Sequence, residues 1–183
     1  MNLLFFYPVA QTAITAAARA KEGCKMKNIV LTLLFLVAVT CKTAAATDID
    51  LGKSITIGNG PKTVIEFTDP DCSYCRKASV YFDGRSDVTR HIFFYPLPFH
   101  PKAKAKARYA LSQQDKANVY HMIMSGSLDR KTSFNATPGG IKLQEEQLEI
   151  AKKHKIDSTP TFMINGRIIE GFDRVRIEEA LGR

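Results

Sequence analysis

The fold of this chain is decided by one stretch, TVIEFTDPDCSYC, which spans residues 63–75. Residues 63–67 are apolar or β-branched apart from Glu66, a pattern typical of a buried strand. Residues 68–71 predict a turn, and residues 75–82 predict a helix that ends before a glycine. Cys72 is therefore expected at the point where a strand passes into the N-terminus of a helix.

Such a position has a chemical consequence for Cys72. Unpaired backbone N–H groups and the positive end of the helix dipole favour an anion there. For a cysteine the anion is the thiolate, which is the nucleophile of disulfide exchange. Cys75 follows one helical turn inside, so we expect Cys72 to be exposed and close enough to Cys75 to form a small disulfide. The pair predicts a redox-active dithiol in which Cys72 attacks and Cys75 resolves the mixed disulfide.

Two other uses of a CxxC pair are possible. A structural zinc site needs four ligands, but the four histidines are scattered singly and no second ligand pair follows. An inert disulfide across two residues at a helix start would be unusual. We therefore expect neither a bound metal nor another cofactor.

The N-terminal segment has the features of a secretory signal. Lys25-Met26-Lys27-Asn28 is a basic start, residues 29–39 form a short apolar run, and residues 44–46 place small side chains in an A-x-A arrangement. This tripartite pattern predicts a signal peptide that starts at about Met26 and is cleaved near Ala46. The protein is then expected in the periplasm.

Under this interpretation, residues 1–46 combine an upstream extension, residues 1–25, with the signal peptide. An uncleaved membrane anchor is the alternative, because residues 3–18 are also fairly apolar. Residues 47–183 are expected to form one domain.

Charge and cysteine usage in residues 47–183 narrow the class of protein. This part contains 21 Lys or Arg and 17 Asp or Glu, a formal net charge of +4 against +8 for the whole chain. Such a balance predicts no nucleic-acid partner. Cys72 and Cys75 are its only cysteines, and one pair in a reactive position does not make a disulfide-stapled scaffold.

The rest of the chain predicts an α/β fold with a central mixed sheet. The order is strand, strand, helix, strand, helical insertion, helix, β-hairpin and helix. Further strands are expected at 54–57 and 91–95, a broken helical insertion at 101–124, a loop at 125–140, a helix at 143–154, a hairpin around Asn165-Gly166 and a last helix at 173–181.

The helical insertion carries Lys102, Lys104, Lys106 and Arg108 at every second position. On a helix this spacing scatters the charges around the cylinder, which predicts a solvated surface. A docking patch for an acidic partner is the alternative.

Three stretches, FTDPDCSYC (67–75), YPLPF (95–99) and STP (158–160), resemble the thioredoxin superfamily. The closest resemblance is to the catalytic domain of bacterial periplasmic disulfide isomerases of the DsbC/DsbG type, over residues 52–182. It implies a thioredoxin-like fold with a helical insertion. It also implies a thiol:disulfide interchange enzyme, an isomerase or reductase, that acts on secreted client proteins with disulfides and receives electrons from a membrane thiol donor.

The resemblance assigns roles to residues outside the CxxC motif. Pro160 corresponds to the cis-proline that faces the disulfide, and Thr159 before it would pair with an extended substrate strand. Glu66 corresponds to the acid that thioredoxins and the oxidase DsbA place under the CxxC motif. It would accept a proton from Cys75, and burial would raise its pKa. An ordinary trans proline and a solvent-facing Glu66 are the alternatives.

The chain departs from the isomerases in two respects. The N-terminal dimerisation domain of that family is not recognisable before residue 52, and no cysteine stands near Ala110 or in the loop after Ser125, where the isomerases carry a second disulfide. We therefore expect a monomer and a weaker isomerase. Two other functions stay open. One is a soft-metal (copper) carrier that uses both thiolates, with Met163 as the nearest further ligand. The other is a substrate-binding chaperone whose redox chemistry is vestigial.

Overall fold

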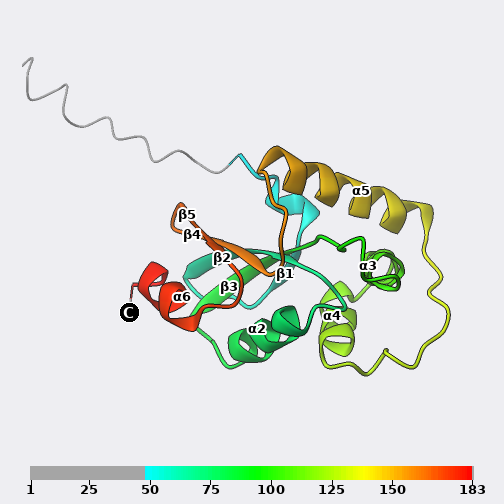
Figure 1. Ribbon diagram of the computed structural model, residues 1–183, viewed down its shortest axis with the longest axis horizontal. Coiled ribbons are helices and arrows are strands. Elements are labelled where there is room, and N and C mark those ends of the chain that lie inside the picture. Colours follow the sequence, from blue (N-terminus) through cyan, green and yellow to red (C-terminus); the bar gives the residue numbers. More distant parts are fainter. Residues whose placement is uncertain (1–47, 183) are drawn as a thin grey trace, which may run out of the picture. The chain divides into compact units, whose positions relative to one another are not determined.

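A five-stranded sheet forms the centre of the part of the chain that the computed structural model describes, residues 48–182 (Figure 1). The signal peptide and its cleavage site lie outside these residues. The strand order is β1-β3-β2-β4-β5, where only the β2–β3 pair is parallel. The strands are β1 (Ile55–Ile57), β2 (Lys62–Thr68), β3 (Val88–Phe94), β4 (Thr161–Ile164) and β5 (Arg167–Glu170). The predicted mixed sheet is confirmed.

Helices lie on both faces of this sheet. They are α2 (Ser73–Asp83), α3 (Ala103–Leu111), α4 (Lys116–Met124), α5 (Pro138–Lys153) and α6 (Arg174–Ala180), and a short 3-10 helix η1 (Leu51–Lys53) precedes β1. Figure 1 shows α5 on one face and α2 with α6 on the other. The predicted helical insertion is confirmed as α3 and α4, between β3 and α5. None of the helices in residues 48–182 has the length and apolar character needed to cross a bilayer.

The side chains of β2 point alternately to the two faces of the sheet and so divide the core into two parts. Phe67 packs with Phe93 and Ala151 under α5, whereas Val64 packs with Ala78 and Phe82 of α2. A third cluster joins Cys72 and Cys75 to the insertion helices. Since side chains alternate along a strand, Glu66 shares the face of Val64 and lies towards α2.

Two predicted boundaries are wrong. β3 begins at Val88 rather than at residue 91, because its first residues continue the parallel pairing with β2 from Lys62 onwards. Helix α5 begins at Pro138, so the predicted loop is shorter than 125–140. The Thr137 side chain accepts a hydrogen bond from Gly140 N at 3.1 Å, and this cap with a proline in the first turn starts the helix despite the two glycines.

Candidate active site

The turn between β2 and α2 sets the position of both cysteines. Cys72 is the N-cap residue of α2, and Cys75 lies in its first turn. Cys72 N donates to Asp69 O at 3.2 Å, and Asp71 N donates to Asp69 Oδ1 at 2.6 Å. These bonds close the turn and place Cys72 at the N-terminus of α2. Both sulfurs are free thiols.

Cys72 has the properties of an attacking thiol. Its pKa is lowered to about 6, chiefly by the hydrogen bond with the Cys75 side chain. A hydrogen bond with Thr159 also lowers this pKa, whereas burial of the thiol acts to raise it. The expectation that Cys72 is exposed is wrong, because only 8 % of the residue is accessible. The loop before β4 covers it, with the Cys72 Sγ 3.5 Å from Thr159 O.

Cys75 has the opposite properties. It is fully buried, and this burial raises the pKa of its thiol well above the ordinary range, to which the hydrogen bond with Cys72 also contributes. The backbone N–H of Asp69 donates to its sulfur at 3.4 Å. The two thiols are therefore distinguished by their surroundings, because one is readily ionised while the other stays protonated until a base removes its proton.

Thr159 lies directly against Cys72, and Pro160 follows Thr159 in the chain. The peptide bond between them is cis, as the resemblance implies. Pro160 O accepts a hydrogen bond from Gly171 N at 2.8 Å, which ties this loop to the end of β5. The Thr159 hydroxyl has no hydrogen-bond partner among the described residues, although it is buried. The loop therefore places the Thr159 backbone carbonyl beside the Cys72 sulfur.

Glu66 lies on the face of the sheet that α2 covers and is fully buried, so a solvent-facing orientation is excluded. Burial raises the pKa of its carboxyl, while Arg90 opposes this rise. Its Oε2 is 3.5 Å from Arg90 Nη1, whereas Oε1 has no hydrogen-bond partner among the described residues. The nearby Thr68 hydroxyl lowers the pKa of both Glu66 and Cys75, although its distance or angle to each falls outside ordinary hydrogen-bond geometry. Glu66 and Thr68 therefore lie on the same face of β2, the face that α2 with Cys75 covers.

A family model described as a thioredoxin-like domain matches residues 52–175. The chain belongs to the thioredoxin-like domain family.

Relatives of this thioredoxin-like domain carry names from disulfide exchange. A probable thiol:disulfide interchange protein DsbC of Bordetella avium is 27% identical over 137 residues, which are 74% of this chain and 47% of the relative. A second relative, from Bordetella pertussis, is 24% identical over 135 residues, 73% of this chain and 46% of its own. This chain thus spans about half the length of the curated relatives that it matches.

Solved structures agree with this assignment. A disulfide interchange protein from Neisseria gonorrhoeae is 29% identical with a TM-score of 0.60, and the match covers 72% of this chain and 94% of that one. A thioredoxin-like oxidoreductase from Silicibacter pomeroyi is 20% identical with a TM-score of 0.57, over 70% of this chain and 90% of its own, and supports the fold.

Sequence reasoning missed a residue that holds the thioredoxin-like site together. The Asp69 carboxylate is fully buried and accepts hydrogen bonds from the backbone of Asp71 and from Leu97 N, the latter at 2.6 Å. It also lies 3.0 Å from His100 Nδ1. An Asp before proline in a turn was a detectable signal, because Asp side chains bind nearby backbone N–H groups.

Met163 does not approach the dithiol. It packs with Ile65 and Phe67 in the core cluster under α5, on the opposite face of the sheet from Glu66. The expectation that Met163 supplies a further metal ligand is therefore wrong. Among residues 48–182, no group of three or more His, Cys, Asp or Glu side chains is arranged to hold a metal ion.

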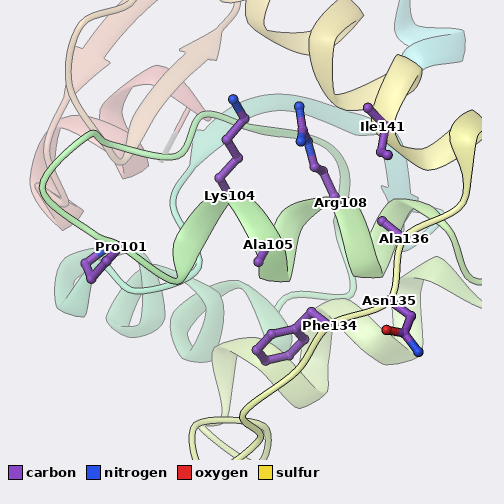
Figure 2. A pocket seen from close by; sticks show the side chains of 8 residues that line it. All are labelled: Pro101, Lys104, Ala105, Arg108, Phe134, Asn135, Ala136 and Ile141. Atoms are coloured by element: carbon purple, nitrogen blue, oxygen red, sulfur yellow. The ribbon is translucent and has the colours of Figure 1, made fainter.

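Two surface hollows border α3. The larger, about 670 Å³, is formed by α3, residues 134–136 and the first turn of α5, and includes Lys104, Arg108 and Phe134 (Figure 2). None of the candidate site residues lines it. The smaller, about 410 Å³, includes Ser73 of the CxxC motif and therefore opens beside the dithiol.

Proposed function

We propose that this domain is a thiol:disulfide interchange enzyme, acting on protein disulfides as an isomerase or a reductase. The observation that carries the proposal is the contrast between Cys72 and Cys75. One thiol at the start of α2 has its pKa lowered to about 6, while its buried neighbour has a raised pKa. The names of the relatives point to the same chemistry.

The geometry supports a balanced two-step exchange. The Cys72 thiolate attacks one sulfur of a client disulfide, forming a mixed disulfide and releasing the other client sulfur as a thiolate. Cys75 then transfers its proton towards Glu66 and attacks Cys72. This step releases the second client thiolate and leaves a Cys72–Cys75 disulfide, so two electrons pass from the dithiol to the client. Thr159 and Pro160 would hold the client strand beside Cys72.

A trapping experiment tests this function. The Cys75→Ser variant should accumulate mixed disulfides with a small disulfide-bonded protein, because the resolving thiol is absent. The Cys72→Ser variant is the matched control and should trap none. Equal trapping by both variants, or trapping by Cys72→Ser alone, would contradict the assigned roles.

The same variants separate this function from the two alternatives. A soft-metal carrier would bind one Cu(I) per dithiol, visible as a mass shift of the reduced protein under native conditions, without disulfide turnover. A vestigial chaperone would suppress aggregation of an unfolded client equally well in the wild type and in Cys72→Ser. Turnover of a client disulfide that is lost in Cys72→Ser decides for the enzyme.

We further propose a periplasmic location, secreted client proteins and a membrane thiol donor of electrons. The tripartite pattern that ends at Ala46 supports export. Fractionation, with mass analysis of the N-terminus, tests it: a mature chain starting near Thr47 is expected, and one that retains residues 1–25 would contradict it.

We also propose that the enzyme acts as a monomer and reduces disulfides better than it isomerises them. The contact of Cys72 with Thr159 and the ion pair of Glu66 with Arg90 are formed within a single chain. Sedimentation, run beside refolding of a scrambled multi-disulfide protein and reduction of an accessible disulfide, tests this. A stable dimer with efficient reshuffling would refute it.

A further inference from the structure

Lys106 of α3 is a buried lysine that the dithiol chemistry above does not use. Its side chain is 2 % exposed, and its Nζ lies 2.5 Å from Asp71 Oδ1 and 2.7 Å from Asp129 Oδ1. The prediction of a solvated surface for the whole Lys-rich helix is therefore wrong at this position. Lys106 lies on the buried face of α3 with Ala103 and Ala110, which lie one turn away on either side.

Arg76 completes a cluster with the same two carboxylates. Its guanidinium binds Asp129 through two hydrogen bonds of 2.7 Å and lies 3.6 Å from Asp71. Arg76 Nη2 also donates to Pro70 O at 3.2 Å. Asp71, Arg76, Lys106 and Asp129, here called the Asp71 cluster, join the turn before Cys72 to α2, α3 and the segment after α4.

The Asp71 cluster is balanced in charge, with two cations and two carboxylates. Arg76 and Lys106 hold the pKa of Asp129 far below its ordinary value, against its desolvation. The cluster borders the smaller hollow, where His100 and Lys102 are the other ionisable groups, and His100 is paired with Asp69. No charge is therefore left over within the cluster itself.

The position of Asp71 explains why this balance matters. Asp71 directly precedes Cys72, and a carboxylate close to a thiol disfavours the thiolate through like-charge repulsion. Only 21 % of the Asp71 side chain is exposed, so water screens this repulsion incompletely. A cation held against the carboxylate cancels most of it.

We propose that Lys106 is a positioning residue for Cys72, which holds and neutralises the Asp71 carboxylate so that it does not oppose negative charge on the neighbouring sulfur. This inference rests on the proposed function, in which Cys72 is the attacking thiol. It gives the helical insertion a role in the exchange reaction, because α3 brings the required cation to the turn.

The test is the pH profile of Cys72 alkylation in the reduced full chain, read site by site by mass spectrometry. Lys106→Met keeps the length and volume of the side chain and removes its charge. We expect the Cys72 pKa to rise by about half to one unit, so that labelling at pH 5 slows about three- to ten-fold. Lys104→Met is the matched control, because Lys104 is exposed on the same helix and borders the other hollow (Figure 2).

A double variant separates charge from disruption. In Lys106→Met/Asp71→Asn the uncompensated carboxylate is gone, so the Cys72 pKa should return to within about 0.3 units of the wild type. If Lys106→Met labels like Lys104→Met, or if the double variant is not restored, the inference is wrong.

A single variant covers the case in which Lys106→Met does not fold. Asp71→Asn leaves Lys106 as an excess cation and should speed labelling of Cys72 at pH 5, whereas an unchanged or slower rate overturns the inference. A wild-type Cys72 that titrates like an ordinary thiol, near pH 8.5, would instead refute the proposed function.

Discussion

Replacing Arg90 by methionine should destabilise the protein by an amount that depends on pH. Arg90 Nη1 lies 3.5 Å from Glu66 Oε2 and 3.4 Å from the Tyr120 hydroxyl, and its Nη2 lies 2.7 Å from Asp83 Oδ1. Asp83 is partly exposed and is solvated by water after the substitution, but Glu66 is fully buried. Methionine keeps most of the apolar contact of the arginine stem, so the main loss is the countercharge of Glu66.

The cost has an upper limit because Glu66 can become protonated. An unfolded Glu titrates near pH 4.3, and holding it neutral in the folded state costs about 1.36 kcal/mol for each pH unit above that value. The limit is about 3.7 kcal/mol at pH 7 and about 1 kcal/mol at pH 5. The pKa of Glu66 is higher in the folded than in the unfolded protein, so the protonated form is favoured by folding. The resulting contribution to stability is complete below the unfolded pKa and is lost as the pH rises through the folded pKa.

Urea unfolding at pH 5, 6 and 7 measures this dependence. The difference in free energy of unfolding between the wild type and Arg90→Met should grow with pH. It should be nearly independent of pH when Glu66→Gln/Arg90→Met is compared with Glu66→Gln. An equal loss at pH 5 and pH 7 in Arg90→Met would refute the view that Arg90 stabilises a charged Glu66.

Three further outcomes follow from individual contacts. Gln147→Leu should lower the free energy of unfolding by about 1–3 kcal/mol, since Gln147 Oε1 accepts from Phe94 N at 2.9 Å and the buried N–H would lose its partner; urea denaturation measures it, and an unchanged midpoint would contradict it. Gly60→Ala should lower the free energy of unfolding more than Gly166→Ala, because a Cβ at Gly60 would lie 2.1 Å from the backbone before β3. At Gly166 there is open space, and only its φ of 76° opposes a side chain, which costs about 1–2 kcal/mol. Thermal unfolding ranks the two variants, and the reverse order would contradict the packing. Finally, the Cys72 pKa of about 6 predicts that the free energy of unfolding of the reduced wild type, relative to Cys72→Ser, grows between about pH 6 and pH 8.5. This gain is lost as the pH falls through 6. A difference between the two proteins that does not change with pH would show that the thiolate is not stabilised.

The residues that sequence alone identified share one property, since their chemistry follows from their neighbours in the chain. A buried strand, a turn and a helix start are local patterns, so the place of Cys72 and Cys75 at the start of α2 was predictable. The order of strands and helices likewise predicted a mixed sheet, which the structure has. The leader before Ala46 stays a prediction.

Tertiary structure alone decided which charges meet and which thiol is covered. Lys104 and Lys106 are both lysines, two positions apart in the chain, yet Lys106 binds Asp71, 35 residues earlier in the sequence, whereas Lys104 is exposed. The limited exposure of Cys72 likewise comes from Thr159, which is 87 residues away. Local sequence specifies backbone conformation and periodicity, whereas ion pairs and burial depend on how separate elements pack. Because a pKa responds to those neighbours, the chemistry of the dithiol became visible only when β2, α2, α3 and the loop before β4 were brought together.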